Sequence, residues 1–211
     1  MRTLIAIPAM DMMHTIFVKS LIGLDRVGQT QIAFTSSSLV YDARNGLAKK
    51  AVSEGFDRML WLDSDMEFAS DFMKRLSADI DDGCEMVCGL YFKRKAPVEP
   101  VIYKEVGYYH SEEAREVTPV ALTYEDYPKD ELFEVGGCGF GGVMMTVDLI
   151  KRVVAEFGQP FSPVMGFGED LSFCKRVAHI GAKMWCDSRA KMGHVGQGTI
   201  TEETYLQTRV K

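Results

Sequence analysis

Two carboxylates follow an apolar run in the first third of the chain. Residues Met59 to Leu62 are all apolar, and the triplet Asp63-Ser64-Asp65 comes directly after them. A continuous apolar run bounded by polar residues is typical of a buried strand in a parallel sheet. Ligands bind just beyond the carboxyl ends of such strands. The pattern therefore places Asp63 and Asp65 where they could share one hard divalent cation. A nearby Lys or Arg side chain or a helix N-terminus could balance the two carboxylates instead of a metal. A plain strand-end turn rich in Asp and Ser would also explain the triplet.

A second pair of acids begins a predicted helix near the end of the chain. Glu169 and Asp170 precede an amphipathic stretch that continues to Ile180 and ends at Gly181. Acids are favoured in a first helical turn by the helix dipole, which is a purely structural explanation. The same dipole is expected to keep a carboxylate ionised, as a general base requires. Asp170 and Glu169 are therefore candidate catalytic residues.

Two cationic or metal-ligating side chains complete the candidate set. His194 lies in a glycine-flanked run from Lys191 to Gly198, which is predicted to be a flexible loop. Such a loop offers a histidine little packing, so a ligand role is favoured once the Asp63-Ser64-Asp65 triplet is considered. Arg44 lies near the start of a predicted helix. It is either a solvated helix charge or a guanidinium that faces the same edge and holds a phosphate.

Alternating strands and helices must position these residues. Apolar runs predict strands over 4–7, 31–35, 59–62 and 85–90. Helical periodicity predicts helices over 13–24, 40–54 and 70–81, with Ser70 as an N-cap and Gly55 closing the second helix. This order predicts a doubly wound parallel sheet. Further along, Thr146 is expected to cap a helix through Phe157, and 182–186 to form a final strand.

The segment between these halves has a different character. Residues 97–134 show no clean helical period and are predicted to form hairpin-like strands or a long ordered loop that serves binding. In the glycine run 136–142, Gly137, Gly139 and Gly142 formally fit G-x-G-x-x-G. A dinucleotide site is rejected because no strand-helix-strand unit with a later acid follows. The glycines are expected to let a ligand or another backbone approach closely.

Composition excludes several classes of protein. The chain has 211 residues, 46% of them hydrophobic and 26% charged, as expected for one globular domain. No run is long enough to span a membrane, and the N-terminus does not read as a signal peptide. Five cysteines without paired spacing predict reduced thiols and a cytoplasmic setting. A net charge of −6 gives no indication of nucleic-acid binding, although Lys93-Arg94-Lys95 is a local basic patch.

Taken in order, several segments resemble the GT-A-fold glycosyltransferases, specifically the family 2-like group. The matching segments are Ile7-Pro8-Ala9, Ala43-Arg44-Asn45, Leu62-Asp63-Ser64-Asp65, the glycine run before Val143-Met144-Met145, Gly168-Glu169-Asp170-Leu171, and His194. The resemblance rests on their order and spacing and spans nearly the whole chain. It implies one α/β domain over 1–211, with a mostly parallel central sheet flanked by helices and an irregular or β segment on the acceptor side. Residues 1–95 would form the nucleotide-sugar-binding half, and 96–211 the acceptor and catalytic half.

The resemblance also implies a reaction and its cofactor. The chain would be a metal-dependent glycosyltransferase, using Mn²⁺ or Mg²⁺ to move a sugar from a UDP- or GDP-linked donor to the hydroxyl of an unknown acceptor. Asp65 would bind the metal, and Asp63 the metal or the donor ribose. His194 would be a further metal ligand on a late loop that closes over the diphosphate. The metal set is thus Asp63, Asp65 and His194.

The remaining roles follow from the same resemblance. Asp170 would be the base that deprotonates the acceptor hydroxyl, and Glu169 would orient the acceptor. On the donor side, Arg44 would lie near the donor phosphate or ribose. The other residues implied in donor binding are Pro8, Ala9 and Met10, which would border the nucleoside, together with Asn45 and Ser64.

Several alternatives stay open. Ser36 to Ser38 stand where many members of the family carry an Asp that recognises uridine, so the donor base is not fixed. A single carboxylate base suits inversion, although some GT-A enzymes with similar ligands retain configuration. A nucleotidyltransferase of similar fold is a rival, but residues 10–14 lack the glycines and basic residues that would hold a triphosphate. An inactive nucleotide- or sugar-binding module is the non-enzymatic rival. Acceptor and oligomeric state are not indicated.

Overall fold

The computed structural model describes residues 1–9, 12–111, 116–196 and 199–209. Its strands are β1 (Arg2–Pro8), β2 (Gln29–Thr35), β3 (Arg58–Leu62), β4 (Met66–Phe68), β5 (Met86–Leu90), β6 (Ile102–Ser111), β7 (Glu116–Thr123), β8 (Leu132–Val135), β9 (Gly137–Cys138), β10 (Gly142–Thr146), β11 (Met184–Val195) and β12 (Thr199–Ile200). Its helices are α1 (Thr15–Ile22), α2 (Val40–Ser53), α3 (Phe72–Asp81), α4 (Val147–Phe157), α5 (Glu169–His179) and α6 (Glu202–Arg209).

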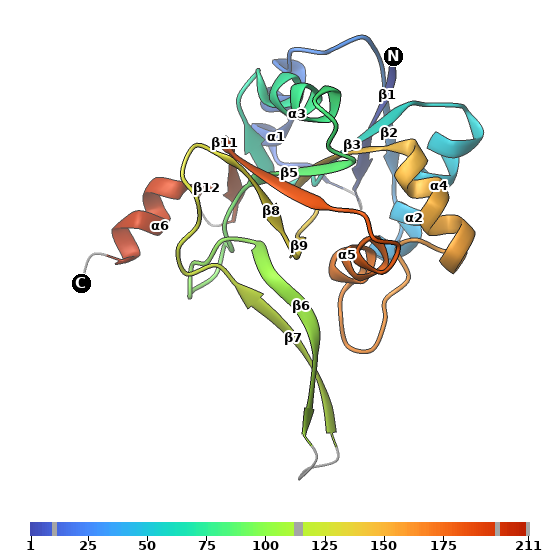
Figure 1. Ribbon diagram of the computed structural model, residues 1–211. Coiled ribbons are helices and arrows are strands. Elements are labelled where there is room, and N and C mark those ends of the chain that lie inside the picture. The colour runs from blue at the N-terminus through green and yellow to red at the C-terminus, as the bar shows by residue number, and fades with distance from the viewer. Residues whose placement is uncertain (10–11, 112–115, 197–198, 210–211) are drawn as a thin grey trace.

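The central sheet is mostly parallel and is flanked by helices. Its strand order is β12-β11-β5-β10-β3-β1-β2 (Figure 1). Strand β1 pairs in parallel with β2 and β3, and β11 pairs in parallel with β5. The expected mostly parallel sheet is confirmed, and one internal strand departs from the parallel order, because β10 lies antiparallel between β3 and β5. The segment that leads into β10 therefore arrives at the edge where β3 and β5 end.

Both faces of this sheet are buried, which explains the continuous apolar runs of its strands. In β3, Leu60 and Leu62 face the side covered by α1 and α3, whereas Met59 and Trp61 face α2, α4 and α5 (Figure 1). These four side chains are fully buried. Trp61 packs edge-on against Phe161, with 5.1 Å between ring centroids. The apolar run thus holds the end of β3 rigidly in place.

Most predicted helix boundaries are confirmed. Thr146 caps α4 as expected, since its hydroxyl accepts a hydrogen bond from the Leu149 backbone N–H at 3.2 Å. Helix α2 ends just before Gly55, whose φ of +68° suits glycine. The prediction for α3 is wrong by one residue. Asp71 occupies its N-cap position, and the Ser70 hydroxyl instead lies 3.3 Å from Asp25.

The last part of the sheet differs from the prediction. The expected strand over 182–186 is the longer β11, and His194 lies on it rather than in a flexible loop. There His194 pairs with Met66 of β4 and Ile200 of β12. Gly193 is needed for close packing, because a Cβ there would lie 2.5 Å from the Thr199 methyl group. The prediction that His194 lies in a flexible loop is therefore wrong, because Gly193 serves close packing between strands.

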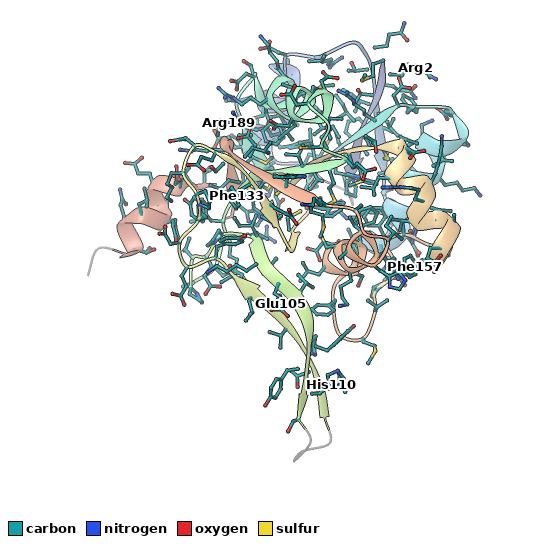
Figure 2. All side chains as sticks on the ribbon, viewed as in Figure 1. Arg2, Glu105, His110, Phe133, Phe157 and Arg189 are labelled. Atoms are coloured by element: carbon teal, nitrogen blue, oxygen red, sulfur yellow. The ribbon has the colours of Figure 1, made fainter. Side chains whose placement is uncertain are left out.

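The middle segment forms the predicted hairpin. Strands β6 and β7 make a two-stranded ribbon that extends away from the body of the protein, and β9 joins it at its base (Figure 1). Near its outer end, His110 is exposed and points away from the core (Figure 2). At the base, Gly136 lies against the Lys104 backbone, where a Cβ would not fit. Close approach of another backbone is thus confirmed for this glycine.

Two expectations from composition can be compared with the structure. All five cysteines lie in the described ranges, and all are buried free thiols, as predicted. Across residues 1–9, 12–111, 116–196 and 199–209, no helix combines the length and the apolar character needed to cross a bilayer.

Candidate functional site

The carboxyl ends of β1, β3 and β5 share one edge of the sheet, and the candidate residues gather there. The Asp63 backbone N–H donates to the Gly141 carbonyl at 3.1 Å, which ties the end of β3 to the segment before β10. The Met66 N–H then donates to the Asp63 carbonyl at 3.2 Å. This tight turn directs the side chains of Asp63 and Asp65 into two different surroundings.

The first surroundings, here called the inner half of the site, comprise Arg44, Asp63, Glu169 and Asp170. Arg44 Nη2 donates to Asp63 Oδ1 at 2.8 Å, and its Nε donates to Glu169 Oε1 at 3.2 Å. The Arg44 side chain is only 3% exposed. Burial by itself would lower the pKa of Arg44, but the two carboxylates outweigh burial and raise it. A permanent buried cation therefore joins β3 to the first turn of α5.

Asp170 is a strongly perturbed carboxyl of the inner half. Its Oδ1 accepts a hydrogen bond from the Leu171 backbone N–H at 2.7 Å. Burial, followed by the negative charge of Glu169, raises the pKa of Asp170 to about 6. The helix dipole favours the ionised form, as expected, but loss of hydration outweighs the dipole and raises the pKa of Asp170. A carboxyl with this pKa is well matched to accepting protons near neutral pH.

The second surroundings, here called the outer half, comprise Asp65, Arg94 and His194. Arg94 Nη1 lies 2.6 Å from Asp65 Oδ2, and His194 Nε2 lies 3.4 Å from the same oxygen. Burial acts to raise the pKa of Asp65, but His194 and then Arg94 outweigh burial and lower it. The Arg94 side chain is 46% exposed. This half is thus held by side chains that solvent can reach.

The orientation of His194 is fixed by its other ring nitrogen. His194 Nδ1 lies 2.9 Å from the carbonyl oxygen of Phe92. A carbonyl can only accept, so Nδ1 must carry the proton. Nε2 then either offers a lone pair or, in the imidazolium form, a second proton to Asp65. This arrangement, in which a backbone carbonyl orients the ring, is the usual one for metal-ligating histidines.

Asp65 and His194 fit one divalent cation, whereas Asp63 is turned to Arg44. Two ligand atoms at about 2.1 Å from one ion and at right angles are about 3 Å apart, close to the 3.4 Å observed. Within the described ranges, no three His, Cys, Asp or Glu side chains converge as a metal site. Mg²⁺ and similar ions often take one or two protein ligands and complete their shell with substrate phosphates and water. The donor set therefore fits a cation that binds together with a diphosphate.

Tyr91 lies between the two halves and was missed in the sequence. Its hydroxyl accepts a hydrogen bond from the Gly141 N–H at 3.3 Å, and its ring meets the His194 ring edge-on at 5.5 Å. A Cβ on Gly139 or on Gly141 would collide with the Tyr91 side chain. These two glycines thus make room for Tyr91 rather than for a ligand. The available signal was its position directly after the apolar run of β5.

The residues predicted to bind the donor lie in different surroundings. Pro8 and Ala9 lie at the correct edge, where the Ala9 N–H donates to the Thr35 carbonyl at 3.1 Å. The Asn45 Oδ1 accepts from the Phe161 N–H at 3.0 Å, so this amide fastens a loop to α2. Ser64 contributes its carbonyl, which accepts from the His14 N–H at 3.3 Å. Met10 lies outside the described residues.

A cavity of about 480 Å³ adjoins the outer half. Its lining includes the rings of Tyr91, Tyr103 and His194 and the basic patch Lys93-Arg94-Lys95. Residue Lys93 pairs with Glu99 at 2.7 Å, and Arg94 with Asp65. Three basic side chains therefore line this cavity, two of them paired with carboxylates, although the chain as a whole carries a net charge of −6.

Comparison with known proteins places this geometry in a fold. No family model and no curated protein sequence matches the chain. The crystal structure of A197 from STIV matches with a TM-score of 0.67 and 18% identity, over 97% of this chain and 92% of that one. The crystal structure of GalNAc-T7 with UDP, GalNAc and Mn²⁺ matches with a TM-score of 0.58 and 13% identity. The chain has a GT-A-like fold.

The match to GalNAc-T7 covers only part of that protein and supports only a statement about the fold. The match covers 92% of this chain but 43% of the GalNAc-T7 chain, so the protein corresponds to less than half of that neighbour. At 13% and 18% identity the likeness establishes the fold and not the chemistry. The activity has to be argued from the residues at the carboxyl edge of the sheet.

Proposed function

We propose that this protein is a metal-dependent glycosyltransferase that uses a nucleotide-sugar donor. The observation that carries the proposal is the convergence of Asp65 and His194 on one position at the carboxyl edge of a GT-A-like sheet, 3.4 Å apart. The raised pKa of Asp170, in the first turn of α5, adds a group able to take a proton. Metal site and base are thus supplied by separate elements at the same edge.

The donor is expected to bind with its diphosphate toward the outer half. The cation held by Asp65 and His194 would neutralise the charge that the diphosphate gains when it leaves. Arg94 and the two neighbouring lysines add positive charge at this position. Pro8 and Ala9, at the end of β1, are left to border the nucleoside. A match to a GalNAc-T7 structure that contains UDP and Mn²⁺ makes UDP and Mn²⁺ the first pair to test.

The inner half is suited to activate the acceptor. Asp170 takes the proton of the acceptor hydroxyl while the oxygen forms a bond to the anomeric carbon of the sugar. The bond from that carbon to the phosphate oxygen breaks, and the nucleoside diphosphate leaves with the electron pair. Asp63 and Glu169 are both held by Arg44, so they can orient donor and acceptor without moving. Direct attack of this kind inverts the anomeric centre.

Arg44 has a different role here from the one the sequence suggested. A side chain with 3% exposure, bound to two carboxylates, is not presented to a donor phosphate. It acts as a positioning residue that fixes the distance between the end of β3 and the first turn of α5. In the outer half, Arg94 is the exposed guanidinium available to a phosphate.

Titration calorimetry with UDP and GDP, with and without Mn²⁺, tests the proposal. We expect one nucleotide to bind in the presence of Mn²⁺ and to bind weakly without it, and Asp65→Asn to abolish the difference. A screen of nucleotide-sugars for Mn²⁺-dependent hydrolysis then identifies the donor. Nucleotide binding that ignores Mn²⁺ in the unaltered protein would contradict the metal site. Binding without any hydrolysis or transfer would favour an inactive binding module.

A further inference from the structure

The side chains of Arg94 and His194 both approach a single carboxylate oxygen in the outer half. Asp65 Oδ2 lies 2.6 Å from Arg94 Nη1 and 3.4 Å from His194 Nε2. Arg94 Nη1 is also 3.5 Å from the Val195 carbonyl, next to His194 in β11. The guanidinium therefore contacts the same carboxylate oxygen that a divalent cation shared with His194 would use.

A divalent cation and this guanidinium are poorly compatible on the same oxygen. Both are positive and both need the Oδ2 lone pairs, so each disfavours the other at short range. The contact is also easily given up, because the Arg94 side chain is 46% exposed and ion pairs of this kind are weak. Arg94 follows the end of β5 in a short loop, which leaves its side chain free to turn toward the neighbouring cavity.

We propose that Arg94 is an exchangeable counter-ion that competes with the metal for Asp65 and moves to the donor diphosphate when the metal binds. The inference rests on the proposed function and concerns the regulation of the same site. In the absence of nucleotide, Arg94 neutralises Asp65 and lowers the affinity for free metal. When metal and nucleotide arrive together, the guanidinium exchanges one anionic partner for another.

The surroundings favour this exchange. Among the described residues that line the cavity of about 480 Å³ beside Asp65, Lys93, Arg94 and Lys95 are basic and none is acidic, although Lys93 is paired with Glu99 at 2.7 Å. Lys95 is exposed and forms no ion pair with any residue in the described ranges. A diphosphate at the mouth of this cavity therefore has basic side chains on one side and the metal on the other. Binding of the metal is thereby coupled to binding of the diphosphate, because a metal that binds without the diphosphate leaves Arg94 displaced and unpaired.

Direct measurement of Mn²⁺ binding tests the inference without relying on turnover. The full chain is titrated with Mn²⁺ alone, and free Mn²⁺ is read by electron paramagnetic resonance at constant pH and ionic strength. Arg94→Met is expected to bind Mn²⁺ about 3–10-fold more tightly than the unaltered protein, because a competitor is removed. Arg152→Met on α4 is the matched control, because Arg152 is also an arginine, is 43% exposed and pairs with Glu85 at 2.6 Å away from the site, and it is expected to change affinity by less than about twofold.

A second titration, with UDP present, tests the other half of the exchange. Here Arg94→Met is expected to bind Mn²⁺ and UDP together about 3–10-fold more weakly, because the diphosphate loses a guanidinium. Equal Mn²⁺ affinity of Arg94→Met and the unaltered protein, or an equal gain in Arg152→Met, would overturn the inference. Undiminished Mn²⁺ binding by Asp65→Asn would instead overturn the metal site of the proposed function. Absence of binding by every protein, even with UDP, would overturn both.

Discussion

The two halves of the site hold their carboxylates in different ways. In the inner half, Asp63 and Glu169 are bound by Arg44, which is 3% exposed and lies over the Phe140 ring at 5.1 Å. In the outer half, Asp65 is bound by Arg94, which is 46% exposed. Both pairs are short, at 2.8 Å and 2.6 Å. Distance alone therefore does not tell a fixed ion pair from an exchangeable one.

Burial makes the difference. A buried guanidinium cannot be replaced by water, so removing it leaves charged carboxylates without a partner. An exposed guanidinium is replaced by water or by a metal ion at small cost. The inner half is thus a fixed frame for the proposed base, and the outer half is a position at which cations can exchange. Four predictions test this contrast.

The largest expected effect lies in the inner half. Asp170→Asn should lower the turnover number about 10²–10⁴-fold, because the acceptor hydroxyl loses its proton acceptor. The affinity for UDP with Mn²⁺, measured by calorimetry, should remain unchanged because the outer half is intact. Asp148→Asn on α4, whose side chain is 76% exposed, is the control for loss of a carboxylate. Full turnover in Asp170→Asn would remove Asp170 as the base.

The two arginines should differ in their contribution to stability. Arg44→Met should lower the free energy of unfolding by about 3–5 kcal/mol, because two carboxylates lose their buried partner. Arg94→Met should change it by less than about 0.5 kcal/mol, as surface substitutions usually do. Urea unfolding of both variants at pH 7.5 measures the contrast. Equal losses in the two variants would show that the halves are not distinct.

The pH dependence of stability should report on Asp170. Its pKa is raised from 3.8 to about 6 in the folded state, so the folded protein binds more protons than the unfolded chain between these values. Stability attributable to Asp170 therefore falls as pH rises from 4 to 6 and stays lower above pH 6. Asp170→Asn should consequently be the more stable protein at pH 8, by at most about 3 kcal/mol.

Comparing the unaltered protein with Asp170→Asn isolates the contribution of the Asp170 carboxyl to stability. Asp79 also has a raised pKa of about 6, owing to burial and to the nearby Asp187. It is present in both proteins, so its contribution cancels in the difference. Unfolding curves at pH 4 and pH 8 for the unaltered protein and for Asp170→Asn provide the four values needed. A difference that does not change with pH would contradict the raised pKa.

The smallest effect is expected at the junction of the halves. Tyr91→Phe removes the hydroxyl that accepts from the Gly141 N–H at 3.3 Å and should cost about 1 kcal/mol of stability. Because the ring itself remains against His194, Mn²⁺ affinity should change by less than about twofold. A larger loss of Mn²⁺ binding would indicate that the Tyr91 hydroxyl links the two halves.

Much of the fold follows from local patterns in the chain. The apolar run Met59 to Leu62 predicted β3, because strands buried on both faces need apolar residues at every position. Thr146 predicted the start of α4, because a capping hydroxyl acts over three residues. The insertion of β10 between β3 and β5 was not predictable from such patterns, since strand order depends on contacts between distant segments.

The candidate site divides in the same way. The sequence by itself determined which residues can do chemistry and that Asp63, Asp65 and Asp170 follow strands or begin helices at a ligand edge. Only the tertiary structure decided that Arg44 is buried between two carboxylates and that Arg94 and His194 meet on one oxygen of Asp65. The physical reason is that ionisation and ion pairing depend on burial and on neighbours across the fold. The spacing of residues along the chain encodes neither the burial of a side chain nor its neighbours in the fold.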